Sequence, residues 1–126
     1  MTADAARRIK GEVAYLSGQA AENAVAAHYQ RAGNKQLAAR WRGSVGELDL
    51  VFENETKLIF VEVKKSKSIA GAAAHLGSRQ IVRLLATAQE YLGHSPDGLL
   101  TDVRFDVALV DAIGEIRVIE NAIGEG

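Results

Sequence analysis

The chain has 126 residues, of which 48% are hydrophobic and 25% charged, a balance typical of a single globular domain over residues 1–126. It contains no cysteine, which excludes a disulfide scaffold, a thiolate zinc site and a cysteine nucleophile. No apolar run reaches the roughly 18 residues of a membrane-spanning helix, and no signal-peptide pattern is present. We therefore expect a cytoplasmic protein without a membrane partner.

The net charge is −1, but the charges are unevenly distributed. Bases outnumber acids over residues 1–46, and acids outnumber bases over residues 91–126. Such a distribution permits one surface that faces a polyanion on a nearly neutral molecule. It is more often typical of ordinary solvated faces, so charge alone does not identify a partner.

The alanine-rich segment 18–32 is predicted to form a helix that Gly33 ends. Helical spacing places Glu22, Val25 and Tyr29 on one face. A carboxylate is therefore expected on the apolar side of this helix rather than on its solvent side.

Two strands are predicted next, over residues 46–52 and 57–64, and the short turn between them indicates an antiparallel hairpin. The second strand has apolar residues on both faces, which is typical of a central strand covered on both sides. Glu62 and Lys64 share one face of this strand because side chains alternate with a period of two.

Residues 66–77 have only a weak pattern and are interpreted as a loop or lid. A second helix is predicted over 78–92, and two further strands over 103–110 and 116–119. The order α-β-β-α-β-β predicts one α/β domain in which a mixed sheet is flanked by helices.

Charged groups within apolar strands need an explanation, because burying an unpaired charge is costly. Asp49 lies on the strand beside that of Glu62 and Lys64, and Glu22 faces inward from the first helix. Three converging carboxylates repel one another unless a cation joins them, and oxygen ligands suit Mg²⁺ or Mn²⁺. The alternative interpretation is a structural ion pair between Glu62 and Lys64.

A cation between Asp49 and Glu62 would polarise a phosphoryl oxygen and lower the pKa of a bound water. Lys64 would orient that water or stabilise charge that develops on the phosphate. Other polar residues have less defined roles. Trp41 either stacks on a base or packs on the hairpin, and Asp106 is expected to pair with Arg104.

Asp49 followed by Glu62-Val63-Lys64 resembles the PD-(D/E)XK pattern of restriction-endonuclease-like nucleases. More narrowly, GELDL at 46–50, FVEVK at 60–64 and RFDV at 104–107 are similar to the motifs of the UPF0102 (YraN) family. The likeness extends over about residues 11–122, which is nearly the whole chain. It implies a single restriction-endonuclease-like, Holliday junction resolvase-like domain.

The resemblance implies a metal-dependent endonuclease that hydrolyses phosphodiester bonds in DNA, with branched DNA such as Holliday junctions among the candidate substrates. By position, it implies Asp49, Glu62 and Glu22 as ligands of Mg²⁺ or Mn²⁺. Those three residues, Lys64 and Gln80 form the implied catalytic set.

The alternative is a nucleic-acid-binding or assembly module on the same fold with weak or no catalysis. It is favoured by the net charge near zero and by the small number of bases, Lys65 and Lys67, that follow the motif. A resolvase-like protein that makes two cuts in a junction of near-twofold symmetry is also expected to form a homodimer.

Overall fold

The computed structural model describes residues 2–55, 57–68, 77–94 and 102–122, with the backbone alone for residues 10–17 and 78. The elements, in chain order, are α1 (Ala3–Arg31), β1 (Lys35–Arg42), β2 (Glu47–Asn54), β3 (Lys57–Lys65), α3 (Ser78–Leu92), β4 (Asp102–Val110) and β5 (Ile116–Ile119). Of the loop or lid expected over 66–77, residues 69–76 lie outside the described residues.

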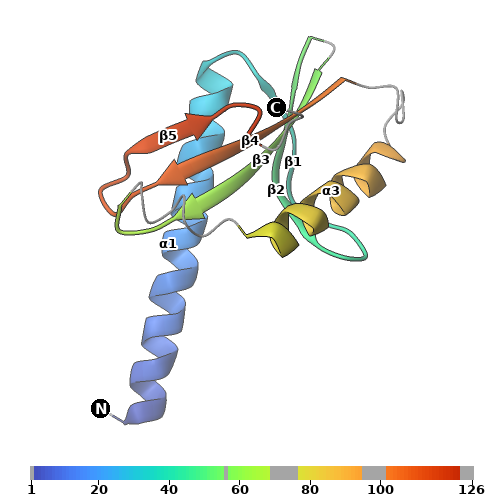
Figure 1. The fold of residues 1–126 in the computed structure, drawn as a ribbon. Helices are drawn as coiled ribbons and strands as arrows, with labels where there is room; N and C mark the ends of the chain where they lie inside the picture. The colour runs from blue at the N-terminus through green and yellow to red at the C-terminus, as the bar shows by residue number, and fades with distance from the viewer. Residues whose placement is uncertain (1, 56, 69–76, 95–101, 123–126) are drawn as a thin grey trace.

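The strands form one mixed sheet in the order β1-β2-β3-β4-β5 (Figure 1). Neighbouring strands are antiparallel except β3 and β4, which are parallel and are joined through α3. The predicted hairpin of β2 and β3, the mixed sheet and the flanking helices are confirmed. No helix of the described residues is long and apolar enough to cross a membrane.

Each helix covers one face of the sheet and makes its own core. On the α1 face, the buried residues are Ala21, Val25, Tyr29, Leu50, Phe52, Ile59, Val61, Ala108 and Val110. On the α3 face, they are Leu48, Val51, Leu58, Phe60, Leu84, Ala88 and Leu92. Because β2 and β3 contribute to both clusters, they are central strands, as the two-sided apolar pattern of β3 predicts.

The strand β1 is absent from the predicted order. It lies at an edge of the sheet, where its residues are exposed or only half-buried, so its sequence carries no continuous apolar pattern. Its pairing with β2 is interrupted by a register shift between Gln36 and Ala38. The Trp41 ring packs edge-on against the Tyr91 ring of α3, with 5.2 Å between the ring centroids. This contact supports the interpretation that Trp41 packs on the protein rather than on a base.

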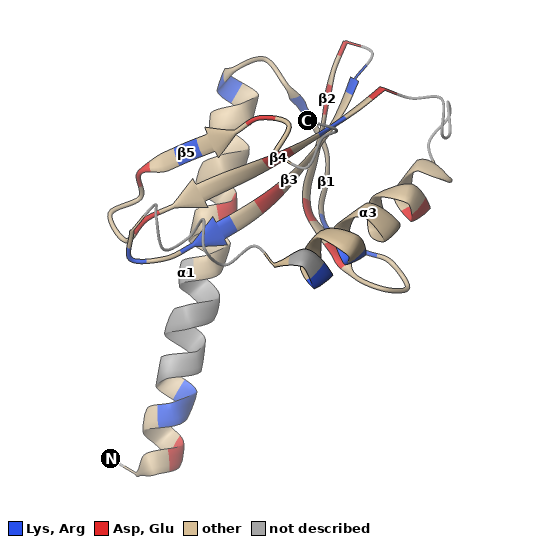
Figure 2. Ribbon diagram, in the orientation of Figure 1, with Lys and Arg blue, Asp and Glu red and all other residues tan. Residues whose placement is uncertain are grey.

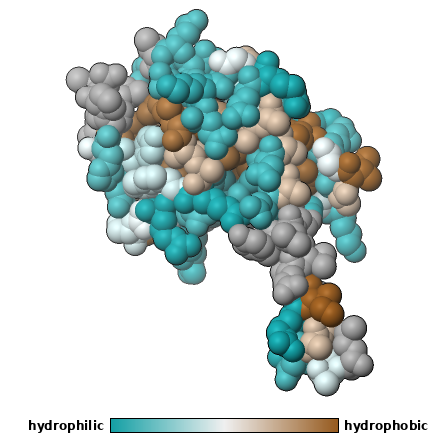
Figure 3. Space-filling view, turned by 180° about the vertical axis from the view of Figure 1, so that it is seen from behind, coloured by the Kyte–Doolittle hydropathy of each residue, from teal (hydrophilic) through white to brown (hydrophobic). Residues whose placement is uncertain are grey.

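The first helix is longer than predicted and begins at Ala3 rather than near residue 18. Its N-terminal end stands clear of the sheet (Figures 1 and 3), and Ile9 there is 49% exposed. A helical end that does not pack on a core needs no apolar stripe, so periodicity cannot predict it. At the other end, Gly33 has a φ of 95°, the left-handed conformation that commonly follows a helix.

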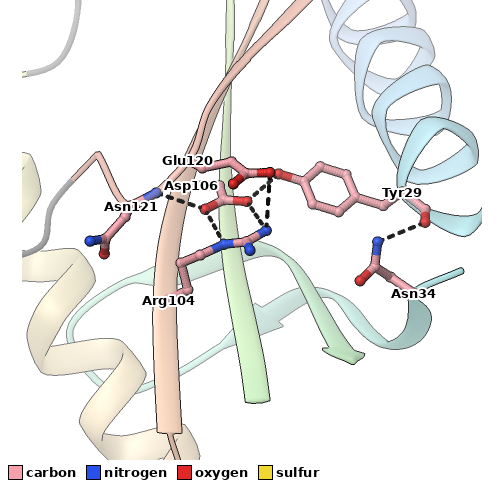
Figure 4. Close-up of polar contacts among 6 residues, drawn as sticks. All are labelled: Tyr29, Asn34, Arg104, Asp106, Glu120 and Asn121. Carbon is pink, nitrogen blue, oxygen red and sulfur yellow. Dashed lines mark hydrogen bonds and ion pairs between the residues drawn. The ribbon is translucent and has the colours of Figure 1, made fainter. Parts of the chain in front are cut away.

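A buried polar network fastens α1 to β4 (Figure 4). Tyr29 Oη donates a hydrogen bond of 2.6 Å to Asp106 Oδ2, and Arg104 binds the same carboxylate through two nitrogens at 2.9 Å. The backbone N–H of Asn121 donates to Asp106 Oδ1 at 3.0 Å. The predicted Asp106–Arg104 pair is therefore confirmed, within a network that also holds the segment after β5.

We expect Tyr29→Phe to lower the free energy of unfolding by about 2 kcal/mol, because it leaves the buried Asp106 carboxylate short of one donor. Urea denaturation measures this loss. Tyr91→Phe is the matched control, since within the described residues the Tyr91 hydroxyl makes no hydrogen bond. Equal losses in the two variants would contradict a role for the hydroxyl.

Candidate active site at the fork between β2 and β3

The candidate site lies where β2 and β3 separate. Their pairing extends to Leu50 and Val61 and stops there. Beyond that point β2 continues against β1, and β3 continues against β4. The two strands therefore form a fork, and backbone groups that face the gap lose their partners in the sheet.

Asp49 fills this gap. It is the first β2 residue beyond the last pair, and its Oδ2 accepts a hydrogen bond of 2.8 Å from the backbone N–H of Val63. A side chain thus replaces the carbonyl that a continuing strand would supply. The requirement for an acceptor at this position explains why a polar side chain occurs within an apolar strand.

Glu62 lies beside Asp49 and is 7% exposed. Its Oε1 accepts a hydrogen bond of 2.8 Å from Gln80 Nε2 of α3 and lies 3.3 Å from Lys64 Nζ. The structure therefore brings together four of the five residues proposed from the sequence: Asp49, Glu62, Lys64 and Gln80. They come from two strands and the first turn of a helix that begins 13 residues after β3 ends.

The two neighbouring carboxylates oppose each other's ionisation. Burial, and after it the negative charge of Asp49, raise the pKa of Glu62 to about 8, although the charge of Lys64 acts to lower it. Burial also raises the pKa of Asp49, which the Val63 N–H lowers and the charge of Glu22 raises. Near neutral pH and without a cation, the pair therefore retains a proton.

Glu22, the fifth proposed residue, has a different partner. Its Oε2 accepts a hydrogen bond of 2.7 Å from Arg40 Nε, and its side chain is 19% exposed. Its charge raises the pKa of Asp49, so it lies near enough to act on that carboxyl group. Across the described part of the chain, no three acidic or histidine side chains are grouped as in a three-ligand metal site.

The donor set nevertheless fits a hard divalent cation. The half-buried Asp49 and the buried Glu62 offer adjacent carboxylate oxygens, and their mutual repulsion favours the binding of a positive charge between them. Mg²⁺ is commonly bound by one or two carboxylates, with water completing its coordination. Asp49 and Glu62 are therefore the residues that would hold Mg²⁺ or Mn²⁺ here.

A cavity of about 460 Å³ opens beside Glu62, between the turn that joins β1 to β2 and the first half of α3. Its lining includes Glu47, Gln80, Arg79 and Arg83. Figure 2 shows basic residues at the C-terminal end of β3 and in the first turns of α3, next to the acidic residue of β3. The arginines were not proposed from the sequence, although their spacing of four places both on one side of the helix.

A mixed sheet with a helix on each face, and an Asp–Glu–Lys set at a strand fork, defines a restriction-endonuclease-like domain. The family described as "Uncharacterised protein family UPF0102" matches residues 21–110. A UPF0102 protein of Cereibacter sphaeroides is 54% identical over 114 residues, which are 90% of this chain and 97% of the relative. Another, from Ruegeria pomeroyi, is 49% identical over 117 residues, which are 93% and 95% of the two chains. The chain belongs to the UPF0102 family.

The raised pKa of Glu62 predicts that stability without divalent metal falls as the pH rises. The unfolded chain releases this proton near the ordinary pKa of 4.5, whereas the folded protein keeps it up to about pH 8. The folded state thus binds more protons between these values, and each pKa unit is worth about 1.4 kcal/mol. We expect urea denaturation to show a loss of at least that size between about pH 5 and about pH 8.5.

In Glu62→Gln this pH-dependent loss should shrink, because the amide does not ionise. Glu115→Gln, which changes an exposed acid in the turn before β5, is the control and should retain the loss. If the free energy of unfolding of Glu62→Gln depended on pH as in the unaltered protein, Glu62 would not be the group that loses its proton near pH 8.

Proposed function

We propose that this protein is a metal-dependent endonuclease that hydrolyses phosphodiester bonds in DNA. The observation that carries the proposal is the pair formed by the half-buried Asp49 and the buried Glu62, with Lys64 Nζ at 3.3 Å from Glu62 Oε1. The Val63 N–H needs only an acceptor, which an uncharged amide oxygen would also supply, and the Glu62–Lys64 ion pair needs no second carboxylate. A bound cation does give a reason for a second charged group that raises the pKa of Glu62.

In this proposal Asp49 and Glu62 hold Mg²⁺ or Mn²⁺, which when bound supplies a Lewis acid and a water of lowered pKa. Gln80 donates to Glu62 and thereby fixes the orientation of that carboxylate. The Lys64 ammonium lies beside the same oxygen, where its charge favours the negative charge that develops on a phosphate. Glu22 adds negative charge next to Asp49.

Branched DNA is the proposed substrate on the strength of the family resemblance, and the homodimer stays a prediction tied to it. Two cuts in a four-way junction require two active sites related by near-twofold symmetry. A monomeric protein would remove the paired-cut mechanism, while the proposed chemistry of each site would be unaffected.

A DNA-binding or assembly module without catalysis is a second candidate. It is favoured by the pairing of Glu22 with Arg40, since within the described residues only two carboxylates remain for a cation. The two candidates differ in one outcome, which is whether the purified protein cuts DNA.

Cleavage of labelled duplex, single-stranded and four-way-junction DNA with Mg²⁺ or Mn²⁺ tests the proposal. We expect Glu62→Gln and Lys64→Met each to reduce the rate by about 100-fold or more, because the first removes a ligand of the cation and the second removes positive charge beside the reacting phosphate. Glu115→Gln should cleave like the unaltered protein. Equal cleavage by all variants would assign the activity to a contaminant and contradict the proposal.

Calorimetric titration with Mn²⁺ tests the metal ligands separately from cleavage. Asp49→Asn should abolish binding, because it removes a charged oxygen ligand. The fold should be preserved, because the asparagine amide oxygen can still accept the hydrogen bond from the Val63 N–H. Asp102→Asn, at the exposed start of β4, serves as the control and should bind normally. Binding retained in Asp49→Asn would place the cation elsewhere.

A further inference from the structure

The helix side of the cavity beside Glu62 carries two positive charges. Arg79 and Arg83 line it from successive turns of α3, and both are exposed. Among the described residues, neither guanidinium lies within ion-pair distance of a carboxylate. Guanidinium groups of this kind bind phosphate oxygens through two parallel hydrogen bonds.

The opposite side of the cavity is the turn between β1 and β2, and Glu90 of α3 holds it in place. The Ser44 backbone N–H donates to both Glu90 oxygens at 2.9 and 3.1 Å, and Ser44 Oγ is 3.0 Å from Glu90 Oε2. These contacts lower the pKa of Glu90, so its carboxylate is charged at neutral pH. We call this set of bonds the Glu90–Ser44 clamp.

Two glycines let the turn approach the helix closely. A Cβ at Gly43 would lie 2.7 Å from Glu90 Oε2, and one at Gly46 would lie 2.8 Å from Thr87 Oγ1. The turn is also closed by a hydrogen bond of 2.8 Å from Gly43 N to Gly46 O. The turn between β1 and β2, which forms the wall of the cavity opposite the arginines, is therefore held at a fixed position against α3.

We infer that this cavity is a subsite for the sugar–phosphate backbone of a nucleic acid, with Arg79 and Arg83 as its phosphate contacts and the Glu90–Ser44 clamp as its fixed wall. The inference deepens the proposed function and rests on it for the class of ligand. A volume of about 460 Å³ is in the range of small-ligand sites, which suits a short stretch of backbone. A nucleic-acid strand bound in this subsite would lie next to Glu62, which lines the same cavity.

Fluorescence anisotropy tests the phosphate contacts with a labelled DNA duplex, and with Ca²⁺ in place of Mg²⁺, over a series of salt concentrations. Each phosphate contact contributes about 0.9 to the slope of log K against log salt for duplex DNA. We expect Arg79→Gln and Arg83→Gln each to reduce the slope by about that amount and to weaken binding equally across sequences. Arg117→Gln, which removes the same charge from β5 at the far edge of the sheet, should leave the slope unchanged.

Equal slopes in Arg79→Gln, Arg83→Gln and Arg117→Gln would overturn the subsite, as would a failure of the unaltered protein to bind the duplex. These outcomes are separate from the proposed catalysis. Binding that falls in the two α3 variants of a protein that never cuts DNA would support the subsite and overturn the nuclease. Cleavage of DNA by a protein whose Arg79→Gln and Arg83→Gln variants keep the unaltered salt dependence would support the nuclease and overturn the subsite.

The clamp is tested by Glu90→Ala and Glu90→Gln in the same assay. Glu90→Ala should weaken DNA binding, whereas Glu90→Gln should retain most of it, because its amide oxygen still accepts from the Ser44 N–H. Thermal midpoints check that both variants are folded. Full-strength binding by a folded Glu90→Ala, or an equal loss in Glu90→Gln, would overturn the clamp as the wall of the subsite.

Discussion

The hydrogen bond from the Val63 N–H to the Asp49 carboxylate is the interaction on which the candidate site depends. Separating two central strands exposes backbone groups that the interior cannot solvate, and a buried N–H without a partner costs about 1–3 kcal/mol. A carboxylate solves that problem, but it also introduces a charge beside Glu62. The placement of a carboxylate at the fork therefore both satisfies the Val63 N–H and causes the repulsion between Asp49 and Glu62.

The strain is sustained because the rest of the sheet is firmly held. Both helices bury apolar faces against β2 and β3, and the Asp106 carboxylate receives donors from α1, β4 and the segment after β5. The two carboxylate sites therefore differ in the number of donors that they receive. Asp106 is saturated with donors and contributes stability, whereas Asp49 and Glu62 share too few donors and oppose each other. Functional sites commonly carry such a local cost.

The sequence predicted the elements that depend on strong patterns. The apolar residues on both faces of β3 identify a central strand, and Glu62 and Lys64, which interrupt that pattern, stand out as exceptions that need a reason. The edge strand β1 has no comparable pattern, so Arg40 and its bond to Glu22 could not be anticipated. The Glu90–Ser44 clamp joins residues 46 positions apart, and only the packing of a turn on a helix reveals it.

The position of Arg40 gives the site a definite charge balance. Asp49, Glu62 and Glu22 carry three negative charges when ionised, and Lys64 and Arg40 supply two positive ones. The proton that the carboxylate pair retains makes this group of five neutral. Replacing that proton with a divalent cation would leave one positive charge, which matches the single negative charge of a phosphodiester. The Arg40–Glu22 ion pair therefore does more than keep Glu22 from binding a cation. Without Arg40 the same exchange would leave a neutral site with no attraction for its proposed substrate, so the edge strand that lacks a sequence signal sets the charge that the site presents.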